Sequence, residues 1–173
     1  ISEIYRIEET DGTKMFIDFE PYEAFYAEID EKREFVPQKW NITHNGTTFL
    51  TDKLQDWVNY KIDNFSGYVS YEFEFETDFP THTELIIEEA YHVVKLYVND
   101  KYVDIKMWQP YSFDITDFVV TGKNKIRIEC GNLFSNSLKH YKDKTRWQTA
   151  IHRTNPIDSY KSGIYGEVKV VMF

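Results

Sequence analysis

The residues best suited to binding chemistry gather in one segment, 133–162. It holds six bases against two acids, a net charge of +4 in a chain whose formal net charge is −9. Aromatic rings stand among these bases. A flat ring can stack on the face of a sugar while nearby donors bond its hydroxyls. We therefore expect a carbohydrate site in which Trp147 stacks and Arg146, His140 and Arg153 donate, with Tyr141, Trp108 and Trp40 as further candidates.

A second explanation of segment 133–162 stays open. Long irregular segments in compact domains are usually functional or disordered. The same residues could instead pack against a neighbouring domain of a longer chain. Interleaved basic and aromatic residues also suit single-stranded nucleic acid. The acidity of the whole chain opposes that third reading, because such affinity comes from neutralising phosphates.

Paired carboxylates raise the question of glycoside hydrolysis. Glu72, Glu74 and Glu76 alternate along one stretch, which would separate neighbouring carboxylates by about 6.5–7 Å on a strand. That spacing resembles the distance between catalytic acids in inverting glycosidases. Any solvated strand face shows the same alternation, however. We therefore predict that these residues are not catalytic and that the chain is not an enzyme by itself.

Metal and thiol chemistry has little support in the sequence. The five histidines, at positions 44, 82, 92, 140 and 152, lack helical metal-binding spacing, and Cys130 is a lone cysteine. Asp114, Asp117 and Asn124 are typical turn-capping residues. A calcium ion held by these three is the alternative. We expect no cofactor, with calcium as the remaining possibility.

The dominant hydrophobic period is two residues, which indicates half-buried antiparallel strands. The clearest run is 69–76, and further runs cover 94–98, 125–130 and 167–170. Asn45-Gly46 and Asp11-Gly12 are candidate type I′ hairpin turns. One short helix is expected over 52–60, with Asp52 as its cap. Many short strands separated by turns predict an all-β sandwich.

Charge and composition divide the chain. Residues 1–36 carry 11 acids and 4 bases, whereas the remainder carries 18 acids and 16 bases. Strands are expected at 3–8, 14–19 and 24–29, followed by a polar run. We interpret 1–30 as the end of a preceding β-domain, 31–36 as a linker and 37–173 as the sandwich. We interpret the chain as a fragment of a longer protein. No apolar run in the sequence is long enough for a membrane helix.

Five short motifs resemble the sugar-binding domain of glycoside hydrolase family 2, a galactose-binding-like jelly roll. They occur in that family's order at 65–75, 94–100, 111–117, 122–128 and 162–168. Asp100 replaces the family's usual Gly, and Tyr165 replaces its Trp. The stretches 54–57 and 19–24 further resemble the C-terminal region of large rhamnosidase-like glycosidases, although Ala24 replaces the usual Ser.

The resemblance implies an antiparallel jelly-roll sandwich and a setting in glycan metabolism. It also implies that catalytic residues lie in a separate domain. The expected function is a non-catalytic carbohydrate-binding accessory domain of a larger glycoside hydrolase. The alternative is a structural scaffold that packs on the catalytic domain and binds no sugar alone. The expected partners are carbohydrate and the rest of the parent chain, with neither nucleic acid nor membrane.

Overall fold

The computed structural model describes residues 4–8, 14–18, 32–78, 81–138 and 161–173, and it divides the chain into two units, Ile1–Glu31 and Lys32–Phe173. In the first unit, β1 (Ile4–Glu8) and β2 (Lys14–Asp18) form an antiparallel pair whose register pairs Glu8 with Lys14. The turn expected at 11–12 and the strand expected at 24–29 lie outside the described residues.

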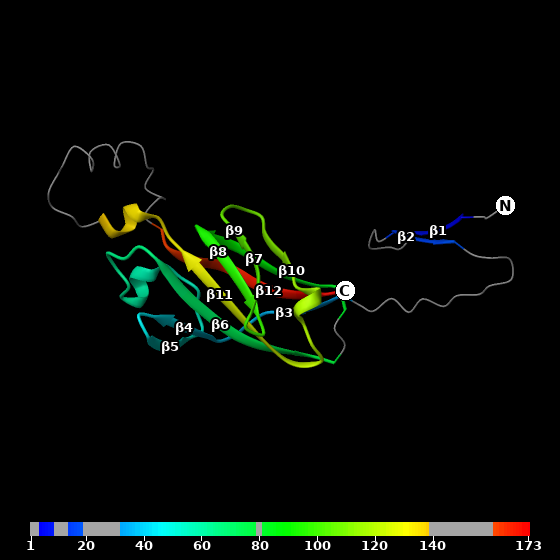
Figure 1. The fold of residues 1–173 in the computed structure, drawn as a ribbon, viewed down its shortest axis with the longest axis horizontal. Coiled ribbons are helices and arrows are strands. Elements are labelled where there is room, and N and C mark those ends of the chain that lie inside the picture. The colour runs from blue at the N-terminus through cyan, green and yellow to red at the C-terminus, as the bar shows by residue number, and fades with distance from the viewer. Residues whose placement is uncertain (1–3, 9–13, 19–31, 79–80, 139–160) are drawn as a thin grey trace. The chain divides into compact units, whose positions relative to one another are not determined.

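The second unit is an antiparallel, all-β sandwich, the fold class predicted from the sequence (Figure 1). Its larger sheet has the order β5-β4-β6-β11-β8-β9 and its smaller sheet the order β10-β7-β12-β3. The larger sheet contains Thr47–Thr51, Trp40–His44, Tyr68–Thr77, Gly122–Gly131, Val93–Val98 and Lys101–Lys106 in that order. The smaller contains Tyr111–Asp114, Thr83–Tyr91, Gly163–Met172 and Arg33–Phe35.

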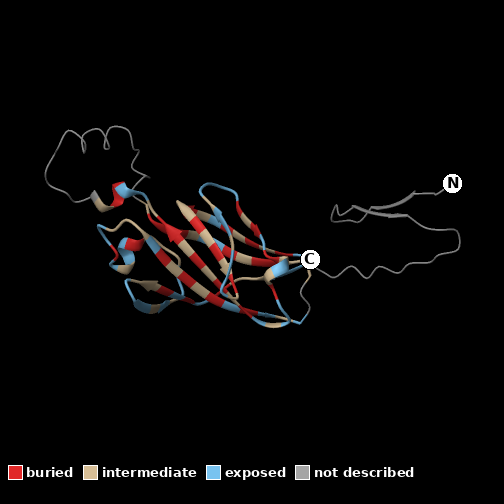
Figure 2. Ribbon diagram, in the orientation of Figure 1, coloured by how far each residue is buried: buried red, intermediate tan, exposed pale blue. Residues whose placement is uncertain are grey.

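The core lies between the two sheets and is built by the predicted alternation. On β6 every second side chain is buried, and β11 and β8 repeat this pattern (Figure 2). The six-stranded sheet contributes Trp40, Ile42, Val69, Tyr71, Phe73, Phe75, Val94, Leu96, Val98, Ile126, Ile128 and Cys130. Burial raises the pKa of the Cys130 thiol to about 12, so this thiol is unsuited to act as a nucleophile.

Two-residue turns set the register of the hairpins at the two edges of the larger sheet, β4–β5 and β8–β9. Asn45 and Gly46 have φ of 47° and 76°, the left-handed values that a type I′ turn requires, as predicted. Asn99 and Asp100 likewise have φ of 51° and 63°. An aspartate can adopt this conformation at modest cost, which explains why the second turn needs no glycine.

The short 3₁₀-helix η1 (Trp57–Tyr60) is later and shorter than predicted. The expected cap, Asp52, is wrong: Asp56 is the cap, and its Oδ1 accepts a hydrogen bond from Val58 N at 3.0 Å. The boundary of the sandwich also differs from the expected one. The residues 33–35, inside the proposed linker 31–36, form strand β3. They are a strand because they pair with β12, with Phe35 opposite Val170.

Asn124 illustrates how turn residues are fixed in this fold. It is fully buried at the start of β11. Its Oδ1 accepts from Val120 N at 2.8 Å and from Asn99 Nδ2 at 2.9 Å, while its Nδ2 donates to the carbonyl oxygens of Val120 and Gly122. The capping role predicted for Asn124 therefore holds. The two hydrogen bonds that Oδ1 accepts use the acceptor capacity of this oxygen within the turn.

Candidate functional site

Most of the predicted ligand-binding residues lie outside the described part of the chain. These are Trp147, Arg146, His140, Tyr141 and Arg153. Trp108 is described and is 72% exposed, so its ring is free to stack on a ligand. Trp40 is only 2% exposed and packs edge-on against Phe73 in the core. The candidate role of Trp40 in ligand binding was therefore wrong.

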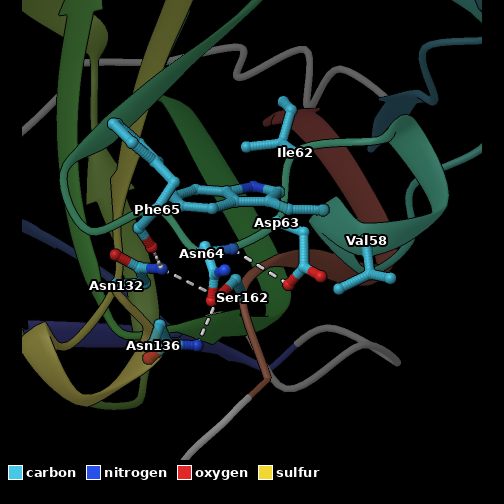
Figure 3. A pocket seen from close by; sticks show the side chains of 9 residues that line it. Val58, Ile62, Asp63, Asn64, Phe65, Asn132, Asn136 and Ser162 are labelled. Atoms are coloured by element: carbon cyan, nitrogen blue, oxygen red, sulfur yellow. Dashed lines mark hydrogen bonds between the residues drawn. The ribbon is translucent and has the colours of Figure 1, made fainter. Parts of the chain in front are cut away.

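The two stems of segment 139–160 are fastened to the same end of the sandwich. One stem is η3 (Phe134–Leu138), which follows β11, and the other is the start of β12. Figure 3 shows the side chains of Asn132 and Asn136 converging on Ser162. Their Nδ2 atoms donate to Ser162 Oγ at 2.9 and 2.7 Å. Asn132 also donates to Phe65 O and accepts from Gly67 N, which ties both stems to the start of β6.

The hollow beside this asparagine cluster is too small for a sugar. Its lining includes Trp57, Phe65 and Ser162, and its volume is only about 10 Å³. A volume of this size holds roughly one water molecule. The asparagine cluster is therefore an anchor for the segment rather than a ligand pocket.

Beside this anchor, five side chains from distant parts of the sequence form a half-exposed polar group, which we call the Tyr91 cluster. Its members are Asp56, Glu89, Tyr91, Lys161 and Tyr165. Tyr165 Oη donates to Asp56 Oδ2 at 2.5 Å, and Lys161 Nζ donates to Tyr91 Oη at 3.1 Å. Tyr91 Oη in turn donates to Glu89 Oε1. The two tyrosine rings meet edge to face, with centroids 5.4 Å apart.

The electrostatics of the Tyr91 cluster keep both phenols protonated. Burial, followed by the hydrogen bond to Asp56, raises the pKa of Tyr165. The hydrogen bond to Glu89, together with burial, raises the pKa of Tyr91. The Lys161 ammonium lies 5.0 Å from the centroid of the Tyr91 ring, within range of a cation–π contact. The cluster thus combines aromatic rings, hydroxyl donors, an ammonium and carboxylate acceptors.

Sequence reasoning did not find the Tyr91 cluster because its members come from separate segments. In the sequence, Tyr165 stands out only as the residue that replaces Trp in the motif at 162–168. In the fold, β12 and β7 are adjacent strands, and Tyr165 on β12 pairs with Glu89 on β7. Tyr91 lies two residues after Glu89, so the two tyrosines become neighbours. That register follows from the fold and was not readable from spacing alone.

Two of the three glutamates that suggested glycosidase chemistry, Glu72 and Glu74, are held in ordinary surface ion pairs. Glu74 pairs with Lys123 at 3.0 Å and Glu72 with Lys125 at 3.1 Å, both across the β6–β11 ladder. Within the described ranges, no group of three or more His, Cys, Asp or Glu side chains is arranged to hold a metal ion. No helix in the described part of the chain is long and apolar enough to cross a membrane.

His92, which follows Tyr91, makes stability depend on pH. Partial burial lowers its pKa below 6.5. As the pH falls, His92 is therefore protonated at a higher pH in the unfolded chain than in the folded one. The stability that its neutral form contributes above about pH 6.5 is lost as the pH falls toward the lower pKa of the folded state. We expect the free energy of unfolding, measured by urea titration, to decline as the pH falls below about 6.5, and His92→Gln to reduce that decline. An equal decline in both proteins would contradict this role.

Comparison with known proteins identifies the fold but no family. No family model matches the sequence, and no curated protein sequence matches it. A rhamnosidase structure from Novosphingobium sp. PP1Y aligns over 92% of this chain and 17% of its own, with 17% identity and a TM-score of 0.60. A Bifidobacterium dentium β-glucuronidase aligns over 84% of this chain and 30% of its own, with 13% identity and a TM-score of 0.59.

A β-glucuronidase from Ruminococcus gnavus gives a similar result. It aligns over 87% of this chain and 31% of its own, with 13% identity and a TM-score of 0.61. Identities this low show that the folds are alike and nothing more. This chain thus spans less than a third of each of these glycoside hydrolases and has the fold of a β-sandwich found within them.

Proposed function

We propose that this chain is a non-catalytic, carbohydrate-binding accessory domain of a larger glycoside hydrolase, of the galactose-binding-like type. The observation that carries the proposal is the Tyr91 cluster beside the stems of segment 139–160. Carbohydrate sites need rings for stacking and mixed donors and acceptors for hydroxyls, and this cluster supplies both. The fold shared with parts of a rhamnosidase and two β-glucuronidases supports the setting.

In this proposal, segment 139–160 completes the site. Trp147 provides the main stacking surface, while Arg146, His140, Tyr141 and Arg153 add donors. Segment 133–162 holds six of the 20 lysine and arginine residues against two acids, a net charge of +4 in an otherwise acidic chain. From the described side, Tyr91 and Tyr165 offer ring edges and hydroxyl oxygens that can accept, because their phenol protons are donated to Glu89 and Asp56.

The test is a calorimetric titration of the chain with rhamnose, galactose, glucuronate and soluble polysaccharides. We expect saturable binding that weakens at least about tenfold, ~1.4 kcal/mol, in Trp147→Ala and in Tyr91→Ala. Tyr102→Ala is the matched control, because Tyr102 is an exposed tyrosine on β9. Binding that survives both Trp147→Ala and Tyr91→Ala would contradict this site. The absence of binding across the panel would contradict the carbohydrate function.

A scaffold that packs on the catalytic domain and binds no sugar is the second candidate. Large apolar side chains are exposed on the sandwich, including Met107, Trp108 and Phe134, and such exposure is typical of contact surfaces. The two functions are distinguished by adding the parent catalytic region in trans. Tight association that is lost in Met107→Ser/Trp108→Ser, without sugar binding, would favour the scaffold.

A further inference from the structure

A groove lies between β9 and β10, which are edge strands of the two sheets and contact each other. Its volume is about 270 Å³, close to the lower limit for small-molecule sites. Asp104 and Lys106 line it from β9, Ser112 and Asp114 line it from β10, and Phe118 adds an aromatic surface. No residue of this groove belongs to the Tyr91 cluster.

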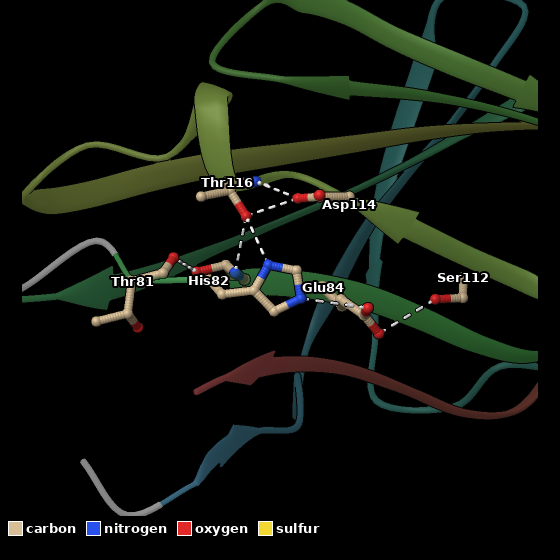
Figure 4. Close-up of polar contacts among 7 residues, drawn as sticks. Thr81, His82, Glu84, Ser112, Asp114 and Thr116 are labelled. Carbon is tan, nitrogen blue, oxygen red and sulfur yellow. Dashed lines mark hydrogen bonds and ion pairs between the residues drawn. The ribbon is translucent and has the colours of Figure 1, made fainter. Parts of the chain in front are cut away.

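Asp114 is held rigidly on one wall of the groove. Thr116 donates to its Oδ1 twice, from N at 3.0 Å and from Oγ1 at 2.6 Å (Figure 4). These two bonds lower the pKa of Asp114, so the carboxylate is ionised at neutral pH. Both hydrogen bonds end on Oδ1, and no donor among the described residues bonds to Oδ2. The second oxygen therefore keeps its capacity to accept a hydrogen bond from a ligand.

The other polar groups of the groove supply a complementary set. Lys106 Nζ donates to the Ser112 carbonyl oxygen and lies 5.1 Å from the Phe113 ring centroid, which holds the ammonium between the strands. An ammonium has three donors, so two stay available. Asp104 Oδ1 accepts from Ile105 N at 2.7 Å, which orients this carboxylate on the opposite wall from Asp114.

We infer that this groove is a second ligand site, which binds one neutral sugar ring. The Asp104 and Asp114 carboxylates accept from hydroxyls at opposite edges of the ring, and the Lys106 ammonium donates to a third oxygen. Phe118 and Val103 cover the apolar face of the ring. The two carboxylates against one ammonium give the walls a net charge of −1. An anionic sugar such as glucuronate is repelled, so the groove selects neutral rings.

The groove and the Tyr91 cluster are separate sites. Asp114 pairs with Glu84 near the start of β7, whereas Tyr91 is the last residue of that strand. Seven residues of extended strand correspond to roughly 23 Å. Binding in the groove is therefore independent of the carbohydrate function proposed for the Tyr91 cluster, and either can fail alone.

The test is amide-resolved NMR titration of ¹⁵N-labelled chain with methyl galactoside, methyl rhamnoside, methyl glucoside and glucuronate. We expect saturable shifts of the Lys106, Ser112 and Asp114 amides with at least one neutral glycoside, with weaker or no shifts from glucuronate. Asp104→Asn/Asp114→Asn should weaken binding at least about tenfold. Asp117→Asn is the matched control, since Asp117 lies in the neighbouring η2 (Thr116–Phe118) but does not line the groove.

The titration distinguishes binding in the groove from binding at the Tyr91 cluster. The inference is overturned if no neutral glycoside shifts the groove amides, if glucuronate binds there as tightly as the neutral sugars, or if the double variant still binds normally. Shifts confined to Tyr91 and Tyr165 would support the site proposed above and overturn the groove. The variants are exposed, nearly isosteric changes, and a thermal melt of each confirms that the domain is folded.

Discussion

Replacing Trp57 by alanine is expected to lower the free energy of unfolding by about 4 kcal/mol, which corresponds to roughly 10 °C in melting temperature. The indole is 1% exposed and packs against Phe65. Its Nε1 donates to Tyr71 Oη at 2.7 Å inside the core. The substitution leaves a large cavity and deprives a buried hydroxyl of its partner. Chemical unfolding monitored by circular dichroism measures the loss.

Trp108 provides the matched control for Trp57. It is the same residue type but is 72% exposed, so Trp108→Ala should change stability by less than about 0.5 kcal/mol. Trp57→Phe retains most of the packing and loses the hydrogen bond, so we expect an intermediate loss of about 1–2 kcal/mol. Equal stability of Trp57→Ala and Trp108→Ala would show that the core is not packed as described.

Replacing Gly163 by alanine should cost about 3 kcal/mol, an unusually large effect for one added methyl group. Gly163 begins β12 with φ of 107°, which is unfavourable for any side chain. Its Cβ would lie 2.8 Å from Trp57 Cδ1 and 2.9 Å from Tyr71 Oη, both fixed core atoms. Thermal and urea unfolding of the variant measure the cost.

Gly46→Ala separates the two contributions at Gly163. Gly46 also has a positive φ, 76°, but nothing lies within 4 Å of its added Cβ. We expect a loss of about 1 kcal/mol there, from backbone strain alone. In a Trp57→Ala background, Gly163→Ala should cost clearly less than in the wild type, because part of the clash is gone. Strict additivity of the two substitutions would refute the predicted contact.

The sandwich was predictable from sequence because its strands carry a period-two pattern that burial enforces. Val69, Tyr71, Phe73 and Phe75 alternate with polar residues and are buried as expected. The capping rule predicted the wrong residue because two nearby aspartates suit a helix cap about equally well. Asp52 and Asp56 are both chemically competent caps, and only the contacts of Asp56 with Tyr165 and Ser162 select the second.

The candidate sites were far less predictable than the fold. Trp40 resembled an exposed stacking residue, yet β4 turns it into the core beside Phe73. The Tyr91 cluster and the β9–β10 groove arise where strands distant in sequence become neighbours. Their members have no shared motif, so register and sheet edges must be known before the residues can be grouped.

Arg33 on β3 pairs with Met172 on β12, so the first and last strands of the sandwich are hydrogen-bonded neighbours. A backbone that enters and leaves a unit at adjacent positions, about 5 Å apart, can sit inside a loop of a host protein without displacing the loop's ends. The described ends of the sandwich, Lys32 and Phe173, lie next to these paired residues, a geometry compatible with insertion into a loop.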